Sequence, residues 1–242
     1  SADYAASLDT LWNGGVLNGV PILNNGVDVP QVWAPVSTAQ KLTALPAWPA
    51  NTLVRVLRPW RNYMFGFDVK QGGNRFPHRV MWSHSADPGT VPDSWDISDT
   101  TKDAGEFDLA GTGHVIDALP LRDALIVYKE NSTYSAKFVG APFMFQFQEV
   151  FSSSGMLSPD CAVEIDGSHV VLTSNDLIRH DGTQMQSVID KVTRRWLFKN
   201  IDSAMYNRCF LTKNVYFNEV WVCFPELGAT RCTKALVYNY KD

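Results

Sequence analysis

The sequence has little basic charge and no long apolar run. It carries 21 Lys and Arg against 25 Asp and Glu, a formal charge of -4 and a pI near 5.7. Proteins that read duplex DNA or bind acidic membranes usually carry a basic surface, so neither class is favoured. No apolar run reaches the roughly 18 residues of a membrane span, and the first residues lack a signal-peptide pattern. We expect a soluble protein or part of a soluble assembly, with no membrane span.

Cysteine is also scarce. The four cysteines, Cys161, Cys209, Cys223 and Cys232, show no C-x-x-C spacing and no paired histidines nearby, which argues against a zinc site. Cys223 and Cys232 could face each other across a hairpin, but reduced thiols packed as small core residues are the simpler interpretation. Neither a metal nor a cofactor is predicted.

Motifs of catalysis are missing as well. There is no G-x-S-x-G elbow, no G-x-G-x-x-G, no Walker loop and no spaced Asp loop for Ca²⁺. The histidines lack metal-ligand spacing, although His169 and His180 belong to one group of strands and could meet. Acidic residues crowd positions 87–108, where Gly, Pro and Ser neighbours favour turn hydrogen bonds over a catalytic pair. We predict no catalytic residues and no enzyme.

Short strands and tight turns repeat between Val115 and Val192. Two groups of alternating or apolar segments start near Val115 and Ser158, about 43 residues apart. This spacing lies within the roughly 40–50 residue period of four-stranded propeller blades, and Asp166-Gly167 and Asp181-Gly182 suit hairpin turns. The sequence therefore predicts an all-β fold, a β-propeller of three- to four-stranded antiparallel blades. The expected blades are roughly 52–110, 115–155, 158–192 and 203–242.

Residues 1–50 differ from this pattern. They are rich in Asn, Gly and Pro and predict irregular strands and loops, with Trp33 and Trp48 as core plugs. The chain starts without Met and ends just after a strand-like run, which suggests a piece of a longer or processed chain. The last blade is one strand short, and we expect that strand from residues after Asp242 or from the N-terminal segment.

One short helix is predicted, from Asp190 to Ile201, with Val192, Trp196 and Leu197 at helical spacing. Its basic side chains are Lys191, Arg194, Arg195 and Lys199. They could touch DNA phosphates without reading bases, although the solvated face of an amphipathic helix is the simpler interpretation.

A turn after the first blade strands has a recognisable composition. Ser85-x-Asp87-x-Gly89, followed by Trp95, resembles the Asp-box turn of sialidase-like propeller blades. In the box, Asp and Ser tie back to turn amides and a Trp packs beneath; here the Trp stands later than usual. The box is structural in those families, so the resemblance implies a turn and no sialidase activity.

The strand sequences resemble β-propeller virion proteins of tailed phages, of the tail nozzle, tail-tube or DNA-stabilisation type. The matching elements are Ala124–Lys129 with its terminal Lys, the turn from Gly155 to Cys161, the Asp-Gly turns and the final YNY. The likeness covers about Leu53 to Asp242. It implies a structural protein of the virion, assembled in the host cytoplasm as a homo-oligomeric ring, which we expect to be six-fold. Such a ring would line the DNA exit channel, retain packaged double-stranded DNA, and bind portal-side adaptor proteins and fibres or tailspikes.

Two other functions stay open. A sialidase-like carbohydrate-active propeller would place three Arg in one pocket. A glycan- or receptor-binding module would expose Trp residues such as Trp60 or Trp95 for stacking on sugars.

Overall fold

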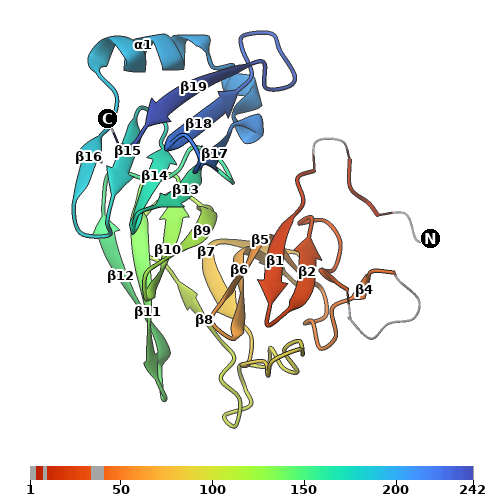
Figure 1. Cartoon of the computed structure of the whole chain (residues 1–242). Helices are drawn as coiled ribbons and strands as arrows, with labels where there is room; N and C mark the ends of the chain where they lie inside the picture. The colour runs from red at the N-terminus through yellow and green to blue at the C-terminus, as the bar shows by residue number, and fades with distance from the viewer. Residues whose placement is uncertain (1–3, 8–9, 34–40, 242) are drawn as a thin grey trace. The chain divides into compact units, whose positions relative to one another are not determined.

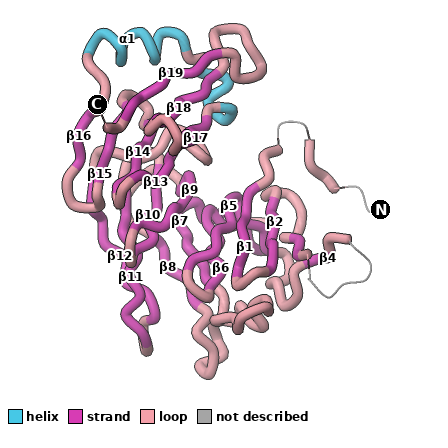
Figure 2. The backbone as a smooth tube through the Cα atoms, in the orientation of Figure 1, coloured by secondary structure: helices cyan, strands magenta, loops and turns pink. Residues whose placement is uncertain are grey.

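The computed structural model describes residues 4–7, 10–33 and 41–241, and its elements are mainly short antiparallel strands (Figures 1 and 2). Five small antiparallel sheets hold three or four strands each and are the blades of a β-propeller, as the sequence predicts. The chain forms two compact units. The first comprises Ser1–Val115 with Gly140–Met144, and the second Ile116–Val139 with Phe145–Asp242.

The first unit contains two four-stranded sheets. One sheet, in the order β1-β2-β3-β4, consists of Asn13–Leu17, Val20–Asn24, Gln31–Val32 and Thr43–Ala44. The other, in the order β5-β6-β7-β8, consists of Thr52–Trp60, Tyr63–Gln71, Asn74–Trp82 and Gly105–Asp108. The described N-terminal residues thus combine a small sheet, in which β3 and β4 have two residues each, with the loops that join its strands.

Asparagine side chains bind the first sheet to β5. The buried Asn24 amide donates to the Val54 carbonyl at 3.1 Å, and the Asn13 carboxamide oxygen accepts from the Leu57 N–H at 2.8 Å. Buried backbone groups need such partners because leaving them without a hydrogen bond costs about 1–3 kcal/mol. The asparagine-rich composition thus serves packing between sheets.

The second unit contains most of three further sheets. One, in the order β12-β11-β10-β9, consists of β9 Val115–Leu121, β10 Ala124–Lys129, β11 Thr133–Gly140 and β12 Met144–Phe151. The next consists of β13 Ala162–Ile165, β14 Ser168–Leu172, β15 Leu177–His180 and β16 Met185–Ser187. The last consists of β17 Phe210–Asn214, β18 Glu219–Phe224 and β19 Lys234–Asn239.

The predicted hairpin turn at Asp166-Gly167 is confirmed. It joins β13 to β14 with φ of 46° at Asp166 and 69° at Gly167. Two consecutive positive φ values are what a tight two-residue hairpin requires, and glycine adopts them without steric cost.

Helix α1 spans Lys191–Asn200 and confirms the predicted helix. Asp190 caps it, because its Oδ1 accepts the N–H groups of Val192 at 2.7 Å and Thr193 at 2.8 Å. The buried face differs from the prediction: Leu197 is buried, whereas Val192 is 79% and Trp196 41% exposed. Apolar spacing marks one helix face, but tertiary packing decides which residues become buried.

The last sheet begins later than the sequence predicts. Ser203–Arg208 forms a short 3₁₀ helix, and β17 starts only at Phe210. Residues Val215 to Asn218 form the turn between β17 and β18. In the described part of the chain β19 pairs only with β18, and strands β1 to β4 pair among themselves, so the N-terminal segment does not supply the fourth strand there.

Candidate functional site

The densest group of chemically capable side chains lies in the second unit, where β10, β14 and β15 bring Tyr128, His169 and His180 together. His169 and His180 are paired in register across β14 and β15, so the predicted meeting of these histidines is confirmed. The Tyr128 hydroxyl lies 2.6 Å from His169 Nδ1 and 2.7 Å from His180 Nε2. Tyr128 is 1%, His169 0% and His180 2% exposed.

The hydrogen-bond partners of this tyrosine–histidine network determine which nitrogen of each histidine ring carries the proton. His169 Nε2 lies 2.9 Å from the Pro120 carbonyl, which only accepts, so His169 donates there and its Nδ1 accepts from the Tyr128 hydroxyl. The Gly182 N–H donates to His180 Nδ1 at 3.2 Å, so His180 Nε2 donates to the Tyr128 oxygen. Every ring nitrogen of the two histidines therefore has a partner while both rings are neutral.

Burial holds this network in its neutral state. Desolvation lowers the pKa of His169 to about 4, and desolvation with the neighbouring His169 lowers the pKa of His180 to about 3. Burial also raises the pKa of Tyr128 well above its ordinary value. The buried and fully paired network therefore ties β10 to the adjacent sheet through neutral hydrogen bonds.

A second buried titratable group is Lys129, at the end of β10. It is 0% exposed, its Nζ lies 5.9 Å from the centre of the Tyr134 ring, and burial lowers its pKa. Its backbone carbonyl accepts the Met156 N–H at 3.0 Å. The strand that carries the phage-like resemblance is thus a packing element.

The acidic residues of positions 87–108, which we call the acidic loop, are held by turn hydrogen bonds. Asp96 Oδ1 accepts from the Ser98 N–H at 2.9 Å and hydroxyl at 2.7 Å. Asp99 Oδ1 does the same with Thr101, at 2.9 and 2.6 Å. These bonds lower the pKa of both carboxyl groups, so both stay negatively charged at neutral pH.

Two further carboxylates of this loop bind the sheet. Asp103 Oδ2 accepts from the Ser85 hydroxyl at 3.0 Å and the Tyr63 hydroxyl at 3.2 Å. Burial and the Asp103 charge raise the pKa of Tyr63 to about 12. Asp108 forms two hydrogen bonds with the Arg79 guanidinium, at 2.8 and 3.0 Å. Among the described residues no group of His, Cys, Asp or Glu has a geometry that could hold a metal ion.

The Asp-box-like residues form a turn whose hydrogen bonds differ from those of the box. The Asp87 carbonyl, not its carboxylate, accepts from the Thr90 N–H at 3.0 Å, and Gly89 has a φ of 77°. The Ser85 hydroxyl binds Asp103 instead of a turn amide. Trp95 is 5% exposed and packs edge-on against Trp48, with ring centres 4.7 Å apart.

A carboxylate that accepts hydrogen bonds from turn amides, as in an Asp box, is found instead at Asp181, between β15 and β16. Asp181 Oδ1 accepts the N–H groups of Thr183 and Gln184, both at 2.8 Å, and the Thr183 hydroxyl at 2.7 Å. These bonds, that of Gln184 first, hold the pKa of Asp181 well below its usual range. The sequence Asp181-Gly182-Thr183 could have indicated this turn, since it combines a carboxylate acceptor with a glycine suited to turns.

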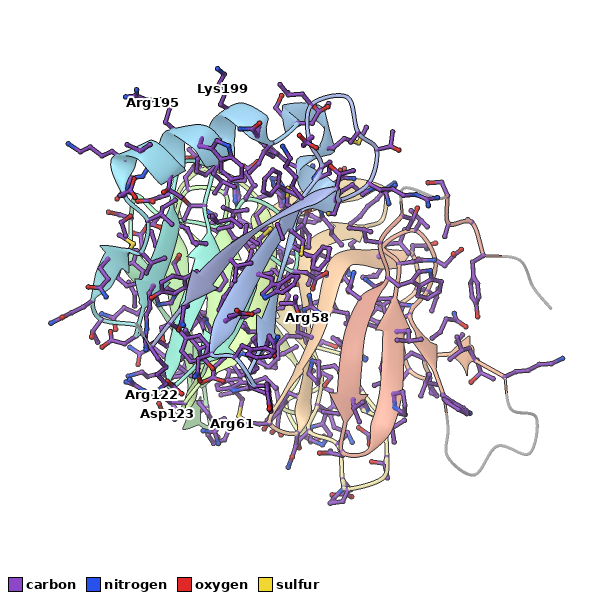
Figure 3. All side chains as sticks on the ribbon, turned by 45° about the horizontal axis from the view of Figure 1, so that its top comes forward. Arg58, Arg61, Arg122, Asp123, Arg195 and Lys199 are labelled. Atoms are coloured by element: carbon purple, nitrogen blue, oxygen red, sulfur yellow. The ribbon has the colours of Figure 1, made fainter. Side chains whose placement is uncertain are left out.

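The basic side chains of α1 fall into two groups. Arg194 donates to Asp176 Oδ2 at 2.8 Å and to the Ser187 hydroxyl at 2.9 Å, which fastens α1 to its own unit. Lys191, Arg195 and Lys199 are exposed, and Figure 3 shows Arg195 and Lys199 pointing outward from the helix. Of the four basic residues predicted to contact phosphates, Arg194 is bound within the chain, and Lys191, Arg195 and Lys199 are exposed.

Large apolar side chains are exposed at hairpin ends. The aromatic tip between β17 and β18 consists of Val215, Tyr216 and Phe217, which are 66%, 83% and 58% exposed. Phe143, beside the β11–β12 turn, is 76% exposed. Contiguous exposed apolar groups of this kind mark interaction surfaces in soluble proteins.

The two tryptophans named above as a sugar platform are buried. Trp60 and Trp95 are 6% and 5% exposed and lie in the core, so neither can stack on a glycan. Trp33, predicted to be a core plug, is 51% exposed instead, whereas Trp48 packs on the core of the first unit.

Polar side chains line two of the surface pockets. One of about 390 Å³ is lined by residues of both charges, including Arg122, Lys137, Asp123, Glu149 and Asp181. Figure 3 shows Arg122 and Asp123 side by side at the β9–β10 turn. This pocket and those of about 340 and 250 Å³ hold at most one arginine each, Arg122 or Arg179, so the three-arginine cluster of a sialidase is not found in them.

The four cysteines are free thiols. Cys223 pairs in register with Ala235 across β18 and β19, while the Cys232 thiol donates to the Arg208 carbonyl at 3.1 Å. The hairpin register therefore does not set Cys223 opposite Cys232.

No helix in the described ranges is long and apolar enough to cross a membrane. Protein-family models give no match, and neither do the curated proteins. Among solved structures, the extracellular domain of a one component system from B. thetaiotaomicron aligns over 100% of this chain and 29% of its own, with a TM-score of 0.54 and 13% identity. YCF48 from Cyanidioschyzon merolae aligns over 91% of this chain and 79% of its own, with a TM-score of 0.35 and 10% identity. The first likeness supports the fold alone, and the chain spans less than a third of that structure.

Proposed function

We propose that this chain is a structural, non-enzymatic subunit of a phage tail, of the nozzle or tail-tube type. Its blades form part of a homo-oligomeric ring, which we propose to be six-fold, around the DNA exit channel of the virion. The ring retains packaged double-stranded DNA and binds adaptor or portal-side proteins and fibres or tailspikes. The resemblance of the strand sequences supports the phage assignment, and the fold supports the scaffold role.

The observation that carries the scaffold role is the contrast between the interior and the hairpin ends. Inside the blades the chemically capable groups, Tyr128, His169 and His180, are fully paired and neutral. Apolar surface is instead presented outward at the aromatic tip, where Tyr216 is 83% exposed. Exposed rigid aromatic groups are typical anchors of protein–protein interfaces. The acidic net charge of -4 also suits a channel through which DNA slides without binding tightly.

We expect the double variant Tyr216→Ser/Phe217→Ser to assemble more weakly than the wild type. Each aromatic ring buries apolar surface on association, and its loss raises the dissociation constant by at least about tenfold, or about 1.4 kcal/mol. Sedimentation velocity over a dilution series measures this change. The matched control is Trp33→Ser, an aromatic residue that is 51% exposed and lies outside the tip, the acidic positions 87–108 and α1. Equal assembly of the tip variant and the wild type would remove the tip from the interface.

A further inference from the structure

The outer face of α1 carries a row of cations. Lys191, Arg195 and Lys199 follow one another at four-residue spacing, so they line one face of the helix over about 12 Å. None of the three has a partner in the described part of the chain, unlike Arg194 with its Asp176 ion pair. We call these three residues the basic stripe. Figure 3 shows that Arg195 and Lys199 extend away from the helix into solvent.

Apolar side chains accompany the basic stripe. Val192 is 79% and Trp196 41% exposed, each next in sequence to a cation of the stripe. A row of charges alone is the ordinary solvated side of a helix, but an exposed Trp and Val beside it leave apolar area in water. A partner that fits this face carries negative charge and some apolar surface.

The acidic loop of the first unit has these two properties. Between positions 87 and 108 seven residues are acidic, Asp87, Asp93, Asp96, Asp99, Asp103, Glu106 and Asp108, and Lys102 is basic. Lys102 pairs with Asp93, and Arg79 pairs with Glu106 and Asp108, so the charge open to a partner comes from the other carboxylates. Asp96 and Asp99 accept hydrogen bonds from uncharged serine and threonine groups only, so their charges are not neutralised. Ile97 lies between them and is 55% exposed.

We propose that the outer face of α1 binds the acidic loop of a second copy of this chain. The two surfaces match in charge, cation against carboxylate, and in their apolar part, Val192 and Trp196 against Ile97. Because the contact joins two different surfaces, it is head-to-tail, and head-to-tail contacts close into rings when the rotation between copies permits. Opposite charges at such an interface set the register and speed association.

Double-stranded DNA is the competing partner for the basic stripe. Phosphates would engage Lys191, Arg195 and Lys199 but offer no apolar surface to cover Val192 and Trp196. A second copy covers both kinds of group, and for that reason it is the better fit.

This inference rests on the proposed assembly role, and charge reversal tests it separately. The variant Lys191→Glu/Arg195→Glu/Lys199→Glu should raise the dissociation constant of self-association by at least about tenfold at low ionic strength. The control Lys41→Glu/Lys70→Glu/Arg231→Glu makes the same change in net charge at exposed positions elsewhere and should assemble as the wild type does. Sedimentation velocity over a dilution series gives the dissociation constants, and circular dichroism verifies that each variant is folded.

The reciprocal change should restore assembly. Asp96→Lys/Asp99→Lys alone should weaken self-association, and a chain that carries both sets of reversals should recover it to within about threefold of the wild type. Added salt should weaken the wild-type contact, because exposed charges are screened.

Three results would overturn the inference: assembly of the reversed stripe like the wild type, equal weakening in the control, or no recovery in the combined chain. The reversed stripe could also assemble normally while losing binding to a short DNA duplex in a mobility-shift assay, which would assign the stripe to DNA. In these cases an oligomeric wild type leaves the proposed function standing, whereas a wild type that is monomeric at every concentration contradicts both.

Discussion

Gly155→Ala is expected to destabilise the protein by more than about 3 kcal/mol, because a side chain at this position has no space. A Cβ on Gly155 would lie 2.0 Å from the Lys129 carbonyl oxygen and 2.5 Å from the Glu130 carbonyl carbon. Both are backbone atoms, and that Lys129 carbonyl also accepts the Met156 N–H at 3.0 Å. The alanine therefore forces the segment after β12 away from the end of β10. Urea denaturation followed by circular dichroism measures the loss.

Gly228→Ala is the matched control. Gly228 lies in the same unit with a φ of 80°, and a Cβ added there would meet no atom within 4 Å. Alanine at this position has only the backbone cost of a left-handed conformation, about 1 kcal/mol. If Gly155→Ala were no more destabilising than Gly228→Ala, the close approach of Gly155 to β10 would be wrong.

Acid should destabilise the wild-type protein through its buried histidines. In the folded state the pKa is about 4 for His169 and about 3 for His180, both below the ordinary value of 6.5. The unfolded chain therefore binds protons more readily, and stability that is complete above pH 6.5 declines as the pH falls, until the folded-state pKa values are reached. The two histidines together lower the free energy of unfolding by about 4 kcal/mol at pH 5 relative to pH 8. Urea denaturation at the two pH values gives the difference.

Replacement of the pair separates this effect from general acid denaturation. His169→Gln/His180→Gln should be less stable than the wild type at pH 8, because the Tyr128 hydroxyl loses its two ring partners. Its further loss between pH 8 and pH 5 should be smaller by most of the 4 kcal/mol estimated above, about 3 kcal/mol or more. Gly228→Ala, which removes no titratable group, should keep the wild-type pH dependence. An unchanged pH dependence in the double variant would show that the histidines are not the cause.

Much of the blade structure follows from local sequence. Strand β10 begins and ends with the run Ala124–Lys129, since an apolar run bounded by turn residues leaves few alternatives. Helix α1 was predictable because Asp190 is a strong cap before a helical pattern. The meeting of His169 and His180 followed from the hairpin register of β14 and β15.

Features that depend on distant contacts were not predictable. Tyr128 joins the two histidines from another sheet, and no spacing in the sequence reveals that approach. The run from Val215 looks like a strand because it is apolar and aromatic, yet it is an exposed turn. Trp33 was predicted to lie in the core only because large aromatic residues are usually buried. The burial of a single aromatic residue depends on the sheet around it, and Trp33 is exposed.

The central claim, that these blades build a ring-forming subunit, is tested most directly by electron microscopy of the purified chain at concentrations where it assembles. The account predicts closed cyclic particles, six-fold in symmetry, with an opening along the axis. Images that show only single, unassociated chains at every concentration would contradict it.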